Sequence, residues 1–229
     1  MKQKLYIAYG SNLNIDQMLH RCPDAVKIGV STIADYKLVF RGNSRSGVLN
    51  IEPAAGESVP VGIWGISQSD EANLDIYEGF PHLYVKQMFK LALNGNSVVA
   101  MAYIMTPGHR IAVPSDYYLR VVADGYEDFG FATDPLMNAV GEARDGFGES
   151  VNAAAAAKRA VDAFAKRQKD GMHYCPRCGR NTVKNHLASN ALSRHADLYV
   201  CDACGTDEAI RAFTGNPLPL AEWAIAKRK

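Results

Sequence analysis

Two Cys-x-x-Cys pairs near the end of the chain restrict its fold more than any other feature. The pairs are Cys175-Pro176-Arg177-Cys178 and Cys201-Asp202-Ala203-Cys204, with 22 residues between them, and each is followed by a glycine. Four thiols at this spacing are typical of two tight turns that meet around one tetrahedral metal ion. We therefore expect the segment to fold as a small module in which the two pairs face each other.

Zinc is the metal that this arrangement favours, because the spacing is that of a zinc ribbon. Disulfides and a redox-active pair are the competing interpretations, but a cytosolic setting disfavours the first and the doubled pair disfavours the second. Since four thiolates complete a tetrahedron, the predicted zinc is structural and plays no part in catalysis. The predicted ligands are Cys175, Cys178, Cys201 and Cys204. We expect the metal to supply much of the module's stability, because so short a segment builds only a small core.

The start of the chain contains a second informative stretch. Leu5 to Tyr9 is apolar and rich in strand-forming residues, which is typical of a strand buried on both faces. Gly10 ends this strand, and Asn14 is a suitable N-cap for a helix with an apolar face at Ile15, Met18, Leu19 and Cys22. The amides just before that helix would attract an anionic ligand. An ordinary strand–turn–helix corner is the alternative interpretation.

The segment Leu74-Asp75-Ile76-Tyr77-Glu78-Gly79-Phe80-Pro81 places one carboxylate, Glu78, at the end of a short helix. Residues 69 to 77 predict a short helix, and Gly79 is suited to a left-handed C-cap. Glu78 would then lie at the negative end of the helix, and shielding by its neighbours would raise its pKa toward the range of a general acid and base. A solvated glutamate in a surface turn is the alternative.

Residues 1 to about 140 resemble the gamma-glutamylcyclotransferase family in several stretches that occur in the same order. The run Tyr9-Gly10-Ser11-Asn12-Leu13 is similar to the family's ligand-binding loop, and Glu78 falls where the family has its catalytic glutamate. Tyr84 and Tyr118 also match. The resemblance implies an α+β fold, with a small, mostly antiparallel β-barrel surrounded by helices.

The resemblance also implies a reaction, the cyclisation of a gamma-glutamyl compound to 5-oxoproline with release of an amino acid or amine. Glu78 would be the general acid and base, and no cofactor would be needed for catalysis. The residues implied in substrate binding are Tyr9, Gly10, Ser11, Asn12, Leu13, Tyr84 and Tyr118. The alternative hypothesis is a non-catalytic ligand-binding or adaptor protein on the same fold, whose zinc ribbon contacts protein or nucleic acid.

The pattern of the remaining residues independently favours α+β. Strands are predicted at 25–33, 36–41, 48–52, 59–66, 83–93 and 97–105, with Asn94-Gly95 as a hairpin turn. Helices are predicted to begin at Pro114-Ser115-Asp116 and at Thr133-Asp134-Pro135. Strands that come first and helices that follow are typical of an α+β fold.

The chain of 229 residues is expected to contain a cyclotransferase-like domain at 1–140, a linker with an alanine-rich helix at 141–171, and a zinc-ribbon domain with a C-terminal helix at 172–229. The segment 145–148 reads as a loop, and a ribbon helix is expected from Thr206.

Charge and hydropathy limit the classes of partner. From residue 171 onward the chain has eight Lys or Arg residues and five Asp or Glu residues, which gives a formal charge of +3. A Zn(Cys)₄ centre carries a charge of −2 and would reduce this to about +1. A nucleic-acid partner is thus only weakly supported, and a role of the ribbon in protein docking or in stability is supported at least as well. The start of the chain is too short to be a signal peptide before the first strand, and no apolar run reaches membrane-spanning length, which predicts a cytoplasmic protein without membrane contact.

Overall fold

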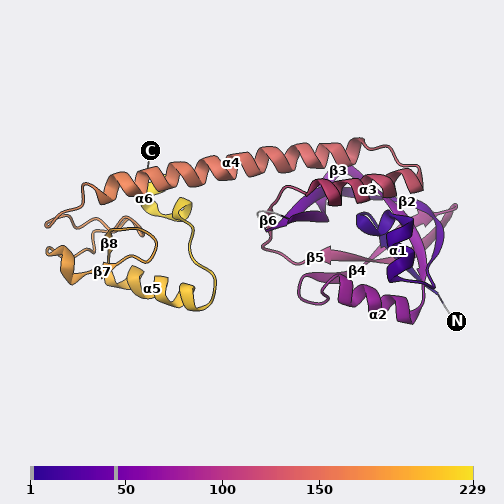
Figure 1. Cartoon of the computed structure of the whole chain (residues 1–229), viewed down its shortest axis with the longest axis horizontal. Coiled ribbons are helices and arrows are strands. Elements are labelled where there is room, and N and C mark those ends of the chain that lie inside the picture. Colours follow the sequence, from indigo (N-terminus) through magenta and orange to yellow (C-terminus); the bar gives the residue numbers. More distant parts are fainter. Residues whose placement is uncertain (1–2, 44–45, 229) are drawn as a thin grey trace. The chain divides into compact units, whose positions relative to one another are not determined.

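The computed structural model describes residues 3–43 and 46–228, and the chain divides into two compact units at 1–147 and 148–229. The first unit (Figure 1) contains a six-stranded sheet with three helices and one 3₁₀ turn, followed by the start of a long fourth helix. In chain order the elements are β1 (Lys4–Ala8), η1 (Ser11–Leu13), α1 (Ile15–Arg21), β2 (Val26–Asn43), β3 (Ser46–Ile66), α2 (Gln68–Tyr77), β4 (Tyr84–Leu93), β5 (Asn96–Met105), β6 (Arg110–Ile111), α3 (Asp116–Phe129) and α4 (Asp134–Ala165).

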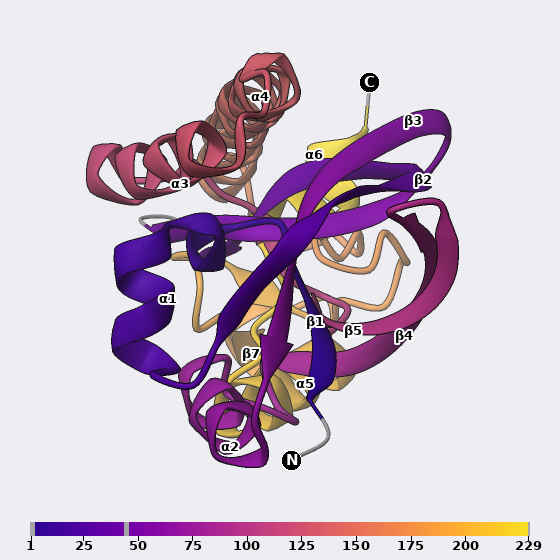
Figure 2. The same cartoon turned by 90° about the vertical axis from the view of Figure 1, so that its right-hand side faces the viewer.

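The sheet has the strand order β4-β5-β1-β3-β2-β6, and its pairs are antiparallel except for β1 with β5. It curls until β4 approaches β2, as Figure 2 shows. The Ser31 hydroxyl of β2 donates to the carbonyl of Ala92 in β4 at 2.6 Å, and the Tyr36 and Phe89 rings meet edge to face. The fold is therefore α+β with a curled half-barrel, as expected.

The strands β2 and β3 are each longer than the sequence predicts. They join the predicted segments 25–33 with 36–41 and 48–52 with 59–66, and the register shifts between Ala34 and Tyr36. At that point Asp35 takes a φ of 60°, and its carboxylate accepts a hydrogen bond from the amide of Gly56 at 2.9 Å. The gaps between the predicted strands are thus an irregularity within one long hairpin rather than separate loops.

Local capping explains where the helices of the first unit begin. The Asn14 side chain accepts from the amide of Gln17, and the Ser115 side chain accepts from the amide of Tyr118. The Asn14 cap was predicted from the sequence, as was the start of the later helix at Pro114-Ser115-Asp116. On α1, Met18 is buried as expected, but Leu19 is 41% exposed, so it does not belong to the predicted apolar face.

The predicted loop at 145–148 is wrong. Helix α4 is continuous from Asp134 to Ala165 and includes both Gly146 and Gly148. The division between the two units lies at Phe147 and Gly148, within this helix. Glycine weakens a helix by only about 1 kcal/mol per residue, so neighbouring helix formers carry the helix through the two positions. The domain boundaries at 140 and 171 stay a prediction.

The second unit is built around the cysteine pairs. After α4 come η2 (Leu187–Ser189), the paired strands β7 (Ala191–Leu192) and β8 (Tyr199–Val200), α5 (Asp202–Phe213), η3 (Leu220–Glu222) and α6 (Ala224–Lys227). Helix α5 begins at Asp202 with Cys201 as its N-cap, four residues before the predicted start at Thr206. Trp223 is fully buried in a core that also contains Val161, Phe164 and Val200. No helix among residues 3–43 and 46–228 is both long and apolar enough to cross a membrane.

Candidate functional site

Glu78 is fixed at the end of α2 by local hydrogen bonds at both ends of that helix. At the start, Ser67 and Asp70 form a capping box. At the end, the amide of Gly79 donates to Ile76 and the amide of Phe80 donates to Asp75, with Gly79 at a φ of 64°. This is a Schellman motif, which satisfies the last carbonyls of the helix and fixes the direction of the Glu78 side chain.

Side chains from the sheet hold α2 in place. The carboxylate of Asp75 accepts from the hydroxyl of Tyr103 at 2.6 Å and pairs with Lys86 at 2.7 Å. Lys86 also pairs with Glu71 at 2.7 Å. The end of α2 is therefore fastened to β4 and β5, and the position of Glu78 relative to the sheet depends on these contacts.

The predicted ligand-binding loop forms a 3₁₀ turn beneath helix α3. Ser11, Asn12 and Leu13 are buried, and the indole of Trp64 donates to the carbonyl of Asn12 at 3.1 Å. A Cβ added at Gly125 would lie 2.5 Å from the amide nitrogen of Asn14. Helix α3 therefore lies so close to the loop that only a glycine fits at this position. The amide of Leu13 donates to the carbonyl of Gly10 at 2.9 Å, and the amide of Ser11 faces the Tyr118 hydroxyl, so the amides of Gly10 and Asn12 are the better candidates for a ligand.

The Asn12 side chain joins the loop to Glu78. Its amide nitrogen donates to the Glu78 carboxylate at 2.9 Å and to the Tyr6 hydroxyl at 2.7 Å. Its oxygen accepts from the Arg21 guanidinium at 2.7 Å. Because Arg21 can only donate, it fixes which end of the Asn12 amide faces Glu78. The loop and the glutamate, 66 residues apart in sequence, therefore lie side by side.

A small cavity opens between the loop and Glu78. Its lining combines the loop, one carboxylate and five tyrosines, namely Tyr6, Tyr9, Gly10, Ser11, Asn12, Leu49, Glu78, Tyr84, Tyr103 and Tyr118. Burial raises the pKa of each of these five tyrosines above its ordinary value, so all five are neutral at neutral pH. The cavity is therefore a polar but uncharged surrounding for a single acid.

The Glu78 carboxyl is poorly hydrated, and burial raises its pKa to about 7. The hydrogen bond from Asn12 and the charge of Arg21 oppose this rise without cancelling it. Glu78 is thus the one group lining the cavity that titrates near neutral pH. A carboxyl of this kind is suited to accept a proton and return it.

The tyrosine hydroxyls differ in whether their hydrogens are already used. Tyr9 donates to the carbonyl of Tyr103 at 2.6 Å, and Tyr84 donates to the carbonyl of Leu49 at 2.9 Å. By contrast, the hydroxyl of Tyr118 accepts from the amide of Leu49, as the hydroxyl of Tyr6 accepts from Asn12. Within the described residues, Tyr6 and Tyr118 are therefore the hydroxyls best able to donate to a ligand.

The structure brings most of the predicted substrate-binding residues to one cavity. Tyr9, Gly10, Ser11, Asn12, Tyr84 and Tyr118 all line it, whereas the fully buried Leu13 does not. Their roles in binding stay a prediction. Arg21 was not predicted as a site residue. Its contacts depend on how α1 packs against the end of α2, and no local pattern around it indicates them.

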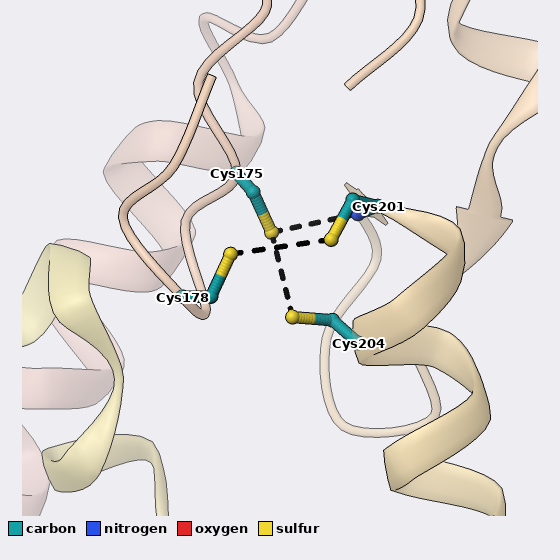
Figure 3. A group of neighbouring side chains, drawn as sticks. All are labelled: Cys175, Cys178, Cys201 and Cys204. Atoms are coloured by element: carbon teal, nitrogen blue, oxygen red, sulfur yellow. Dashed lines mark hydrogen bonds between the residues drawn. The ribbon is translucent and has the colours of Figure 1, made fainter. Parts of the chain in front are cut away.

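The four predicted metal ligands converge in the second unit. Figure 3 shows the sulfurs of Cys175, Cys178, Cys201 and Cys204 pointing toward a common centre, and all four lie within 4.8 Å of one another. The Cys175–Cys204 and Cys178–Cys201 sulfur distances are 3.8 and 3.9 Å. A tetrahedral ZnS₄ site with bonds of about 2.3 Å requires sulfur separations of about 3.8 Å. A disulfide requires about 2.05 Å, so the cluster fits a metal ion and not a pair of disulfides.

The turns around the cysteines are also suited to a metal. Gly179 follows the first pair with a φ of 77°, and the amide of Cys201 donates to the sulfur of Cys175 at 3.4 Å. A Cβ at Gly205 would lie 2.2 Å from the Cβ of Ala191, so the second glycine lets α5 pack against β7. Amide hydrogen bonds of this kind stabilise thiolate charge.

Comparison with known proteins gives the same assignment for the first unit. The family model described as "Gamma-glutamyl cyclotransferase, AIG2-like" matches residues 6–120. The chain is 32% identical over 136 residues to the human protein named gamma-glutamylcyclotransferase, which covers 55% of this chain and 71% of the human one.

Two solved structures are also similar. One is titled "Gamma-glutamyl cyclotransferase", with 29% identity and a TM-score of 0.53 over 60% of this chain and 84% of the other. The second is an uncharacterised human protein with 31% identity and a TM-score of 0.53, over 57% and 82% of the two chains. This chain belongs to the gamma-glutamylcyclotransferase, AIG2-like family.

Proposed function

We propose that the first unit is an enzyme that cyclises a gamma-glutamyl compound. The α-amine of the substrate attacks its own γ-carbonyl carbon, a five-membered ring closes, and the bond from that carbon to the leaving nitrogen breaks. The products are 5-oxoproline and an amino acid or amine. The observation that carries the proposal is the desolvated Glu78 carboxyl, held by Asn12 beside the Gly10–Leu13 loop.

Glu78 would move the proton that this reaction must transfer. An α-amine has a pKa near 8, and Glu78 has a pKa of about 7, so the ionised carboxylate can take the amine proton at little cost. The same carboxyl then returns the proton to the nitrogen that departs. The α-ammonium loses two protons in becoming the ring N–H, and the carboxylate can carry the second to the released amine by the same route. The amine then departs as its ammonium form, and Glu78 ends ionised as it began.

Neutral donors around the cavity would bind the charged parts of the substrate. The amides of Gly10 and Asn12 are the candidates for the α-carboxylate, and the hydroxyls of Tyr6 and Tyr118 are the candidates for the oxyanion that forms at the γ-carbonyl. Tyr9 and Tyr84 would shape the cavity wall. Holding amine and carbonyl together in this way lowers the entropic part of the barrier by several kcal/mol.

For the second unit we propose a structural zinc ion. The four sulfurs would hold it, because their separations match a ZnS₄ tetrahedron. The ion would bring no chemistry to the first unit. Its effect would be to stabilise the small core that surrounds Trp223.

The test measures 5-oxoproline release from γ-glutamyl-alanine, γ-glutamyl-lysine and glutathione. Loss of the general acid and base in Glu78→Gln is expected to lower kcat at least 100-fold, while the variant keeps its fold because glutamine preserves the acceptor for Asn12. Glu127→Gln, an exposed change on α3, is the matched control and should leave turnover unchanged. Equal turnover by the wild type and Glu78→Gln would remove Glu78 from the mechanism, and binding without turnover would favour the adaptor.

A further inference from the structure

One arginine is buried beside the four cysteines of the second unit. Arg177 lies between Cys175 and Cys178 in the first cysteine pair, and it is only 7% exposed. Among the residues that the structure describes, it is the one buried Lys or Arg. Because a guanidinium is always charged, its burial costs free energy unless anionic groups pair with it. The surroundings of Arg177 must therefore supply negative charge.

The acids of helix α5 meet only part of this requirement. A terminal nitrogen of Arg177 pairs with the Asp207 carboxylate, which also accepts from Arg211 at 2.8 Å. The buried Glu208 lies 3.6 Å from Nε of Arg177, beyond hydrogen-bonding distance, and accepts instead from the amide of Arg194 at 2.8 Å. Within the described part of the chain, Nε of Arg177 has no hydrogen-bond partner. The guanidinium has five N–H donors, so several of them are not used by a carboxylate.

The guanidinium also faces a sulfur. An N–H of Arg177 is directed at Cys204, which lies with Cys201 at the start of α5 (Figure 3). The other sulfurs have different surroundings, since Cys175 accepts from the amide of Cys201 at 3.4 Å and Cys178 is exposed to solvent. Cys204 is only 6% exposed, so a thiolate there would depend on Arg177 rather than on water for its stabilisation.

We propose that Arg177 belongs to the metal centre: its guanidinium offsets part of the charge of a Zn(Cys)₄ group at Cys204 and thereby sets how tightly the second unit holds zinc. This inference rests on the zinc site proposed above. Four thiolates around one Zn²⁺ carry a net charge of −2, and a charge-assisted N–H···S contact lowers the free energy of such an anion. The planar fork of a guanidinium can contact Asp207 and Cys204 at once, which a neutral side chain of similar length cannot do.

The test measures the zinc affinity of the full chain by competition with a chromophoric chelator at one fixed pH. Arg177→Met keeps much of the length of the side chain but removes its charge, and we expect it to weaken zinc binding by about tenfold or more. Arg177→Lys keeps the charge and should lie between Arg177→Met and the wild type. The matched control is Arg211→Met, which removes the other cation that pairs with Asp207 and should bind zinc as the wild type does.

Co²⁺ in place of zinc gives a second readout, which a loss of packing alone would not change. A positive charge beside a thiolate stabilises the sulfur electrons, so the sulfur-to-cobalt charge-transfer band of Arg177→Met should move to longer wavelength. The ligand-field bands should stay those of a tetrahedral site, and Arg211→Met should leave both sets of bands in place.

An unshifted charge-transfer band in Arg177→Met, or an equal loss of zinc affinity in Arg177→Met and Arg211→Met, would overturn the inference. If Arg177→Met binds neither metal, Arg177→Lys decides, because binding by this variant supports the role of the charge and absence of binding overturns it. A wild-type chain that binds no zinc would instead overturn the proposed zinc site.

Discussion

The clearest physical consequence of the site concerns stability rather than rate, because a buried acid with a raised pKa destabilises the fold once it ionises. For Glu78 the shift runs from 4.5 in the unfolded chain to about 7 in the folded one. At about 1.36 kcal/mol per pKa unit, this gives an upper limit of about 3 kcal/mol. Since the residue keeps some contact with solvent, which screens the ionised form, we expect the realised cost to be about 1–2 kcal/mol.

The direction of the pH dependence follows from where the proton is bound. Between about pH 4.5 and pH 7 the folded state binds more protons at Glu78 than the unfolded state. The free energy of unfolding therefore falls as the pH rises across this range, and the loss is complete once the pH has passed through 7. Glu78→Gln keeps a neutral side chain at every pH. The variant should match the wild type near pH 4.5 and exceed it at pH 8 by about 1–2 kcal/mol.

The chain offers a convenient probe for this measurement. Its two tryptophans, Trp64 and Trp223, are both buried and lie in different units. In a Trp223→Phe background, urea unfolding followed by fluorescence reports on Trp64, whose indole donates to Asn12 beside the site. A stability difference between Glu78→Gln and Glu78 that is the same at pH 5 and pH 8 would refute the assignment of a raised pKa.

Three further predictions concern activity, metal and packing. The kcat/KM of the wild type should rise with pH through one ionisation near pH 7; a flat profile across pH 5–8 would contradict the role of Glu78 as base. Metal analysis should find one zinc per chain, and Cys175→Ser should unfold the second unit, read by Trp223 fluorescence, at lower urea; protein with reduced cysteines and no zinc would reject the site. Gly125→Ala should cost about 2 kcal/mol, because the new Cβ would lie 2.5 Å from the amide of Asn14. The matched control is Gly141→Ala, on α4 with open space around it, which should be neutral or stabilising. Equal effects of the two changes on stability would show that the close approach of Gly125 to Asn14 does not limit the side chain at position 125.

Local features of the fold could be predicted because the residues that cause them are close in sequence. The Asn14 and Ser115 caps, the Asn94-Gly95 turn and the left-handed Gly79 all follow from the preferences of single residues. The long hairpin and the continuous α4 were not predicted, because in both cases the surrounding structure outweighs a local preference. Pairing along a hairpin outweighs an irregularity at Asp35, and flanking helix formers outweigh two glycines in α4.

By itself, the sequence determined the fold class, the convergence of four cysteines, and the position of Glu78 at the end of a short helix. Only the tertiary structure decided that the Asn12 side chain contacts Glu78, Tyr6 and Arg21 together. Those partners come from three elements, and their distances depend on how β1 and β5 pair and how α1 and α2 pack. Contacts between side chains far apart in sequence are set by that packing, whereas caps, turns and cysteine spacing are set within a few residues of the chain.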